Sequence, residues 1–194
     1  MGFLSVLSTA QKWIAERAGS GDIVIDATAG GGVDTLALAQ LVGANGTVYA
    51  FDIQQEALDR TAKRLEPFIE QQHIARPKLV LDSHSSMADY IPHIEHGKIA
   101  AVMFNLGYLP GGNETVITEP ASTIAALQAS LQLLRRGGII TCMLYPGHEG
   151  GLEEAQAVES WAAALPTDQA QAVIYRQLQR ANSPYLIAIE RRNA

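Results

Sequence analysis

A glycine-rich segment with acids on both sides is the first place where this sequence offers chemistry. Residues 26–35 read Asp-Ala-Thr-Ala-Gly-Gly-Gly-Val-Asp-Thr and follow the apolar residues 23–25. Consecutive glycines let a backbone turn tightly and approach a ligand closely, and a helix that begins after them offers free N–H groups. A nucleotide-type cofactor is the natural occupant of such a turn. The candidate cofactor-binding residues here are Asp26, Gly30, Gly31, Gly32, Asp34 and Thr35.

The charge around the glycines indicates which cofactor would bind. The dinucleotide fingerprint G-x-G-x-x-G needs a third glycine at position 35, where this chain has Thr35. The carboxylate of Asp26, just ahead of the glycines, would repel a pyrophosphate. It suits a cofactor with an ammonium group and a sulfonium, which favours S-adenosylmethionine. The alternative is a tight turn between strand and helix that binds no ligand.

Two further loops are expected to complete this cofactor site. Asp52 lies near the end of an expected strand, where an acid can accept both hydroxyls of a ribose. Its alternative role is to cap the helix that follows. Ile53 and Gln54 come next and would border the adenosine. After the third strand, Ser83 and His84 are candidate neighbours of the adenine, although His84 alone would be read as a surface histidine.

The fourth expected strand leads into Asn105-Leu106-Gly107-Tyr108, similar to the Asn-Pro-Pro-Tyr turn of methyltransferases that modify exocyclic amino groups. An amine nucleophile must be neutral and must aim its lone pair at the methyl group. An amide oxygen and a backbone carbonyl can accept its two N–H bonds. We therefore expect Asn105 and the Leu106 carbonyl to orient an amine and Tyr108 to stack on a base. The alternative is a turn in which Asn105 satisfies only local backbone.

The fifth expected strand leads into Tyr145-Pro146-Gly147-His148, so Tyr145 and His148 would line the same crevice. His148 is a candidate base or simply part of the first turn of the next helix. No Cys, His and Asp residues have the spacing of metal ligands, and neither a G-x-S-x-G elbow nor a Walker motif occurs. The sequence therefore predicts no metal.

Strand-like and helical segments alternate along the chain and must position these residues. The expected strands are 23–26, 47–53, 78–81, 99–104, 139–144, 171–178 and 185–191, and the expected helices are 6–18, 34–41, 55–69, 86–91, 119–134 and 149–164. Such alternation predicts an α/β fold with a parallel sheet, and the last two strands form a hairpin. We expect one Rossmann-like class I methyltransferase domain over 1–194, with a seven-stranded, mostly parallel sheet and a C-terminal antiparallel hairpin. Ligands of such sheets bind at the carboxyl ends of the strands.

Composition excludes several classes of protein. The 194 residues carry a net charge of −6, which disfavours a nonspecific nucleic-acid binder and leaves room only for a local basic patch. The single cysteine, Cys142, excludes an internal disulfide and fits a reducing cytoplasm. No apolar segment approaches the length of a membrane span, and no signal peptide is recognisable.

Four motifs together resemble the MnmM (YtqB) family, over nearly the whole chain. They are 26–35, Asn-Leu-Gly-Tyr-Leu-Pro-Gly-Gly at 105–112, Tyr-Pro-Gly-His-Glu-Gly-Gly at 145–151 and Asn-Ser-Pro-Tyr-Leu-Ile-Ala-Ile-Glu at 182–190. The resemblance implies a class I methyltransferase that uses S-adenosylmethionine. Its substrate would be the 5-aminomethyl amine of 5-aminomethyl-2-thiouridine at the tRNA wobble position, and its product 5-methylaminomethyl-2-thiouridine. The chain departs from the family at Gly31, where Asn is common, and at Val33, where His is common.

The partner implied by the resemblance is the tRNA anticodon stem-loop. Tyr108, Tyr145 and His148 are the candidate contacts to the base. The candidate phosphate contacts are Arg176 and Arg180 on the terminal hairpin, together with Arg135, Arg136, Arg191 and Arg192. Each of these arginines alone would more simply be a solvated surface charge.

Other functions stay open at this level. One is an S-adenosylmethionine-dependent N-methyltransferase of rRNA or of a small-molecule amine, which in the latter case would turn over without RNA. Another is a noncatalytic nucleotide-cofactor-binding module, which would need Asp52 but not Asn105. The apolar first helix either packs on the sheet or forms the contact of a homodimer.

Overall fold

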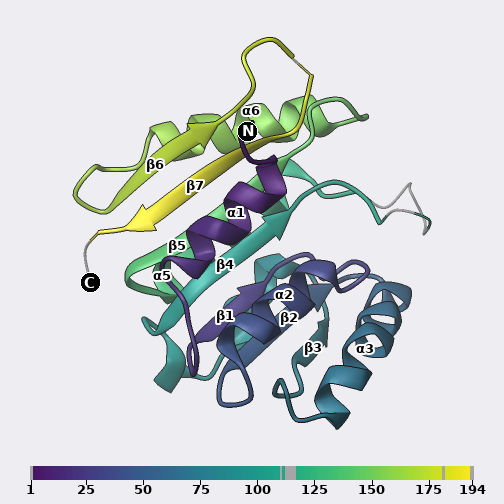
Figure 1. The fold of residues 1–194 in the computed structure, drawn as a ribbon. Coiled ribbons are helices and arrows are strands. Elements are labelled where there is room, and N and C mark those ends of the chain that lie inside the picture. Colours follow the sequence, from purple (N-terminus) through teal and green to yellow (C-terminus); the bar gives the residue numbers. More distant parts are fainter. Residues whose placement is uncertain (1, 110, 112–116, 181, 193–194) are drawn as a thin grey trace.

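The computed structural model of this chain describes residues 2–109, 111, 117–180 and 182–192 (Figure 1). Its strands are β1 (Ile23–Asp26), β2 (Thr47–Asp52), β3 (Lys78–Leu81), β4 (Ile99–Asn105), β5 (Leu134–Leu144), β6 (Ala170–Tyr175) and β7 (Tyr185–Arg191). Its helices are α1 (Val6–Ala15), α2 (Val33–Val42), α3 (Gln55–Glu70), α4 (Met87–Tyr90), α5 (Pro120–Leu133) and α6 (Gly151–Ala163), with short 3₁₀ turns η1 (His84–Ser86) and η2 (His93–Glu95).

The strands form one seven-stranded sheet in the order β3-β2-β1-β4-β5-β7-β6. The pairs from β3 to β5 are parallel, whereas β7 is antiparallel to both β5 and β6. The predicted mostly parallel sheet with a C-terminal antiparallel hairpin is therefore confirmed. The chain leaves β1 toward β2 on one side and reaches β4 on the other. The boundary between β1 and β4 is thus the switch point at which open α/β sheets bind ligands.

Helices cover both faces of this sheet (Figure 1). Strand residues alternate between the two faces, so that Val24 packs with α1 and α2 while Ile25 packs with α5 and α6. Because both faces are covered, the central strands are apolar at nearly every position, as in other parallel sheets. This double burial makes the carboxyl edge of the sheet a rigid platform for the loops that follow it.

Most expected boundaries lie within two residues of the observed ones, three elements differ by more, and a fourth differs in kind. The first helix ends at Ala15 rather than at 18, because the N–H groups of Arg17 and Ala18 both turn back to the Ile14 carbonyl. β5 begins at Leu134 rather than at 139. The sequence around Gly137 predicts a break, but the sheet accommodates this glycine where the register between β4 and β5 shifts. β6 ends at Tyr175 rather than at 178. The expected helix 86–91 is instead the 3₁₀ turn η1 followed by the short α4.

The first helix packs on the sheet, which is one of its two expected roles. Ala10 and Ile14 are buried among residues of the sheet and α2, whereas Phe3, just before the helix, is 95% exposed. None of the helices within the described residues is long and apolar enough to cross a membrane.

Candidate active site

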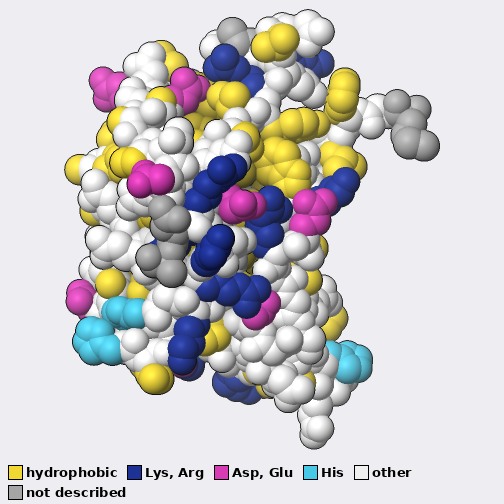
Figure 2. Space-filling view, turned by 90° about the vertical axis from the view of Figure 1, so that its left-hand side faces the viewer, with side chains coloured by type: hydrophobic (Ala, Val, Ile, Leu, Met, Phe, Trp, Pro, Cys, Tyr) yellow, Lys and Arg dark blue, Asp and Glu magenta, His cyan; other side chains and the backbone are white. Residues whose placement is uncertain are grey.

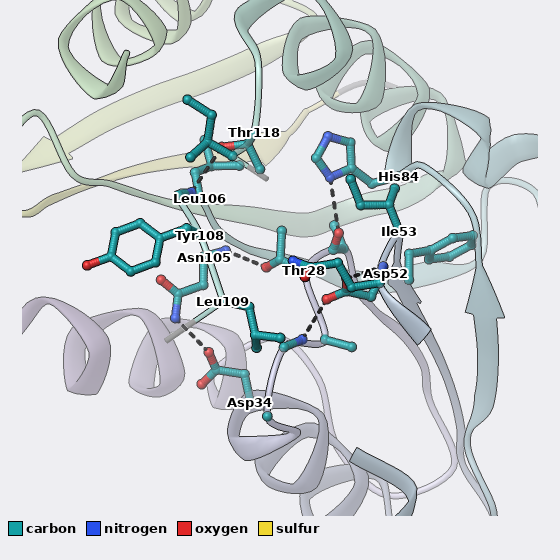
Figure 3. A pocket seen from close by; sticks show the side chains of 18 of the residues that line it. Thr28, Asp34, Asp52, Ile53, His84, Asn105, Leu106, Tyr108, Leu109 and Thr118 are labelled. Atoms are coloured by element: carbon teal, nitrogen blue, oxygen red, sulfur yellow. Dashed lines mark hydrogen bonds between the residues drawn. The ribbon is translucent and has the colours of Figure 1, made fainter. Parts of the chain in front are cut away.

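A cavity with a volume of about 1140 Å³ opens at the carboxyl edge of the sheet (Figure 3). The loops after β1, β2, β3, β4 and β5 all contribute to its wall. The expected site residues on this wall are Gly30, Gly31, Asp34, Asp52, Ile53, Gln54, Ser83, His84, Asn105, Leu106, Tyr108, Tyr145 and His148. Asp26, Gly32, Thr35, Arg176 and Arg180 are not part of it.

The glycine loop brings the start of α2 to the cavity. Gly32 has φ +77°, and a Cβ at this position would lie 2.8 Å from the Thr61 Cα of α3, so only glycine fits. As the residue before α2, Gly32 has no side chain to cap the helix. The first N–H groups of α2 are thus left for a ligand, and Gly31, Val33 and Asp34 line the cavity there.

Asp26 lies beneath this loop rather than on the cavity wall. It is fully buried, accepts a hydrogen bond from the Thr35 hydroxyl at 2.6 Å and accepts another from the Thr28 N–H at 3.1 Å. Burial raises the pKa of Asp26 to about 7, and the neighbouring carboxylate of Asp34 adds to this shift. Asp26 and Thr35 therefore support the loop from behind.

Asp52, at the end of β2, fastens two loops to each other. Its carboxylate accepts hydrogen bonds from the N–H groups of Gly30 and Gln54, both at 2.9 Å. Each carboxylate oxygen has a second lone pair, so the side chain can still accept hydroxyl groups of a ligand. Asp52 thus lies where the glycine loop meets the segment that carries Ile53 and Gln54.

Asn105, at the end of β4, is held by two hydrogen bonds (Figure 3). Its backbone N–H donates to the Thr28 hydroxyl at 2.8 Å, and its amide Nδ2 donates to the Asp34 carboxylate at 3.2 Å. Because a carboxylate only accepts, the amide nitrogen must face Asp34, and the amide oxygen turns away from it. Burial raises the pKa of Asp34, while the hydrogen bonds from Asn105 and Gln11 oppose this shift.

His84 lines the cavity, and one of its ring nitrogens is buried. Its Nδ1 lies 3.1 Å from the Ala27 carbonyl oxygen, and the ring packs edge-on against Phe104 at 5.7 Å between centroids. Since a carbonyl only accepts, Nδ1 carries the proton and Nε2 is left as an acceptor. Within the described residues Nε2 has no hydrogen-bond partner, and burial lowers the pKa of the ring.

Aromatic residues occupy the end of the cavity near β5. The Tyr108 and His148 rings are perpendicular, with centroids 5.9 Å apart. The His148 Nδ1 lies 2.8 Å from the Glu149 carbonyl oxygen, which leaves Nε2 as the acceptor nitrogen. Burial raises the pKa of Tyr145, and Asp34 contributes to this rise. These rings form a surface on which a planar group can stack.

Three basic residues of α3 line the cavity and were not expected from the sequence. Arg60, Lys63 and Arg64 stand at helical spacing on one side of α3. Arg64 donates to the Gly31 carbonyl at 2.6 Å, and Arg60 donates to the Gly111 carbonyl at 2.7 Å across the cavity mouth. The i, i+3, i+4 spacing of cations in the helix that follows Asp52 was the signal that could have revealed them.

The arginines expected to contact phosphate do not line the cavity. Arg176 stacks on Tyr185 and is 3.6 Å from Glu159. Arg135 pairs with Asp22 at 2.7 Å, near the amino ends of the parallel strands and opposite the cavity. Figure 2 looks at this opposite side and shows Lys and Arg side chains interspersed with Asp and Glu. Arg135, Arg136, Arg191 and Arg192 thus lie at the end of the sheet opposite the cavity, and their contact with phosphate stays a prediction.

No group of three or more His, Cys, Asp or Glu residues within the described ranges is arranged to hold a metal ion. The cavity instead combines carboxylates, one oriented amide, helix N–H groups and aromatic rings. Such a set can bind an organic cofactor and orient a second, planar ligand.

Comparison with known sequences gives this arrangement a context. Residues 48–190 match the family model described as "Putative rRNA methylase". The Arabidopsis thaliana protein named "tRNA (mnm(5)s(2)U34)-methyltransferase, chloroplastic" is 39% identical over 177 residues, which are 89% of this chain and 64% of that protein. The chain thus spans about 64% of the length of this curated relative.

Solved structures agree over the full length of the chain. A protein from Clostridium thermocellum described as a "putative rRNA-methylase" has a TM-score of 0.91 and 37% identity, and the match covers 98% of this chain and 100% of that one. A "putative methyltransferase" from Streptococcus mutans in complex with SAH has a TM-score of 0.85 and 32% identity, with coverage of 98% and 99%. Both matches extend over nearly the whole chain.

Proposed function

The chain belongs to the family described as "Putative rRNA methylase", and from this membership we propose that it is an S-adenosylmethionine-dependent N-methyltransferase of RNA. We propose that its substrate is the 5-aminomethyl group of 5-aminomethyl-2-thiouridine at the wobble position of a tRNA anticodon. The product is 5-methylaminomethyl-2-thiouridine. The observation that carries this proposal is the orientation of Asn105, whose amide oxygen turns away from Asp34.

The residues present fit this cofactor. Asp52 would hold the ribose hydroxyls, and the uncapped start of α2 would take the methionine carboxylate. Ser83 and His84, on the loop after β3, would border the adenine. When bound, S-adenosylmethionine supplies an electrophilic methyl group on its sulfonium. The related S. mutans structure in complex with SAH supports the same choice.

The remaining volume suits a nucleoside. Pockets for drug-sized ligands measure roughly 300–1000 Å³, so a cavity of about 1140 Å³ accommodates the cofactor and a flipped base together. The Asn105 oxygen and the Leu106 carbonyl would accept the two N–H bonds of a neutral amine and aim its lone pair at the methyl group. Tyr108 and Tyr145 would stack on the base. The rate enhancement then comes mainly from proximity and alignment.

The RNA backbone has a local site despite the net charge of −6. Lys63 and Arg64 are exposed residues of α3 at the edge of the cavity. Asn182 and Pro184, near Arg180 in the segment before β7, line the cavity from another side. A stem-loop presents few phosphates at once, so two or three cations beside the cavity provide enough attraction.

The choice of tRNA rests on the A. thaliana relative, whose name specifies the modified nucleoside, whereas the family description names rRNA. An amine acceptor agrees with the oriented Asn105 amide independently of either name. We propose a reducing, cytoplasmic setting, because the sole cysteine, Cys142, is a buried free thiol.

The test is methyl transfer from labelled S-adenosylmethionine to tRNA that carries 5-aminomethyl-2-thiouridine, followed by mass analysis of the nucleosides. We expect a gain of one methyl group on that nucleoside. Asn105→Ala should abolish the gain, whereas Gln132→Ala, which truncates an exposed amide on α5, should retain it.

Two results would overturn parts of the proposal separately. Cofactor binding without transfer to this tRNA would refute the substrate, and transfer to rRNA or to small amines under the same conditions would identify the replacement. Full activity of Asn105→Ala would refute the role of the amide even if the substrate is right.

A further inference from the structure

Glu154 is a buried acidic residue that lies outside the cavity. It belongs to the first turn of α6 and is only 2% exposed. Both carboxylate oxygens accept hydrogen bonds, one from the Thr118 hydroxyl and one from the Thr123 hydroxyl, each at 2.7 Å. A buried carboxylate contributes little net stability compared with a well-packed apolar side chain. Its presence therefore calls for a role other than stability.

The hydrogen bond to Thr118 continues toward the segment that follows Asn105. The Thr118 hydroxyl accepts a hydrogen bond from the Gly107 N–H at 2.9 Å, and the Thr118 N–H donates to the Gly107 carbonyl at 3.0 Å. A β-bridge between Tyr108 and Ile117 extends this pairing. The two ends of the loop between β4 and α5 are thus joined at Gly107 and Thr118, and we call this contact the joint. Glu154 connects the joint to α6 through its hydrogen bond with Thr118.

The joint determines where two groups of the cavity lie. The peptide bond before Gly107 carries the Leu106 carbonyl, and the residue after it is Tyr108. Gly107 has φ +122°, and a Cβ there would lie 3.2 Å from the His148 Nε2, so the backbone passes close to that ring. A shift of the Gly107 N–H would therefore move the Leu106 carbonyl and the Tyr108 ring together.

We propose that Glu154 is a positioning residue for methyl transfer, acting through Thr118 on the Leu106 carbonyl and Tyr108. The inference rests on the proposed function, because it assigns those two groups to the amine and the base. Glu154 touches neither the cofactor nor the RNA. It holds the acceptor side of the cavity in place while Asp52 holds the cofactor side.

The structure offers a matched pair of variants to test this proposal. Thr118→Val and Thr123→Val each replace a hydroxyl by a methyl group and each remove one hydrogen bond from Glu154. Only Thr118→Val also releases the Gly107 N–H. Any loss of stability that comes from the buried carboxylate should appear in both variants, whereas a positioning effect should appear only in Thr118→Val.

We expect Thr118→Val to lower kcat by about 10- to 100-fold, the cost of a displacement near 1 Å at a reacting centre. The affinity for S-adenosylmethionine, measured by calorimetry, should stay at the wild-type value. Thr123→Val should keep both quantities, and Thr118→Ser, which retains the hydroxyl, should restore kcat. Amide hydrogen exchange at Gly107 should accelerate in Thr118→Val and not in Thr123→Val.

Equal losses of kcat in the two valine variants would overturn the proposal and assign Glu154 a purely structural role. Unchanged exchange at Gly107 in Thr118→Val would overturn it as well. The exchange measurement does not depend on the identity of the methyl acceptor. If the wild-type protein fails to modify tRNA, the proposed function is refuted. The exchange rate at Gly107 would still test whether Thr118 and Glu154 hold the Gly107 N–H in place.

Discussion

Asp26 gives the sharpest prediction for stability, because it is a fully buried carboxyl with a raised pKa. Burial and the nearby Asp34 raise the pKa of Asp26 from 3.8 to about 7. Between these two pH values the folded protein keeps a proton that the unfolded chain releases. The free energy of unfolding therefore falls as pH rises from about 4 to about 7 and levels off above that range.

The perturbation is Asp26→Asn, which removes this titration and preserves the local contacts. The Asn oxygen can accept from the Thr28 N–H, and its amide group can donate to the Thr35 hydroxyl. A shift of about three pKa units corresponds to about 4 kcal/mol. We expect equal stability of the two proteins near pH 4, to within about 1 kcal/mol, and a gain of about 2–4 kcal/mol for Asp26→Asn above pH 8.

Stability is measured by urea unfolding followed by circular dichroism at several pH values between about 4 and 8.5. The control is Asp59→Asn, an exposed carboxylate on α3, which should shift stability little at any pH. A difference between Asp26→Asn and wild type that stays constant across this pH range would contradict the raised pKa of Asp26. It would mean that the Asp26 carboxyl is already ionised throughout.

Three further predictions concern the cavity. Asp52→Ala should weaken S-adenosylmethionine binding by about 10- to 100-fold in calorimetry, because hydrogen bonds to a charged group contribute about 1.5–3 kcal/mol; unchanged affinity would contradict its place at the ribose. Gly32→Ala should lower the free energy of unfolding, measured in urea, by about 3 kcal/mol or more, whereas Gly21→Ala should lower it by about 1–2 kcal/mol. Both glycines have positive φ, but only a Cβ at position 32 would lie 2.8 Å from a backbone atom. Lys63→Glu should raise the KM for tRNA and lower its salt dependence by about 0.7 in log–log slope for each phosphate that is no longer neutralised. Lys98→Glu makes the same charge change at the amino ends of the strands and should change neither the KM for tRNA nor its salt dependence. Equal effects of Lys63→Glu and Lys98→Glu would argue against an RNA site on α3.

The sheet could be predicted because its signals are local. Each parallel strand is an apolar segment, and each is followed by a turn that its own glycines or polar residues specify. The start of β5 and the end of α1 could not be placed in this way. The start of β5 depends on its register with β4, which residues distant in sequence decide. The end of α1 depends on the hydrogen bonds of its own last turn, whose geometry the residue types do not fix.

The site, too, could be predicted from the sequence only in part. Residue types at strand ends pointed to Asp52 and Asn105, and the structure brings both to one cavity. The hydrogen bond from Asn105 to Asp34 joins residues 71 positions apart, so no local pattern reveals it. The same holds for Glu154, whose partners lie in another helix and in a loop. Sequence patterns identified groups that can react, but only the fold shows which groups hold them in place.

Charge shows most clearly why position matters more than composition. A net charge of −6 argues against binding RNA, and the arginines singled out from the sequence include several that lie on the side away from the cavity. In contrast, the α3 cations border the cavity itself. Electrostatic attraction is screened within about 8–10 Å at physiological salt, so the distant acids weaken it little. An acidic protein can therefore bind one loop of RNA tightly enough to present a single base, while the rest of its surface repels longer duplexes.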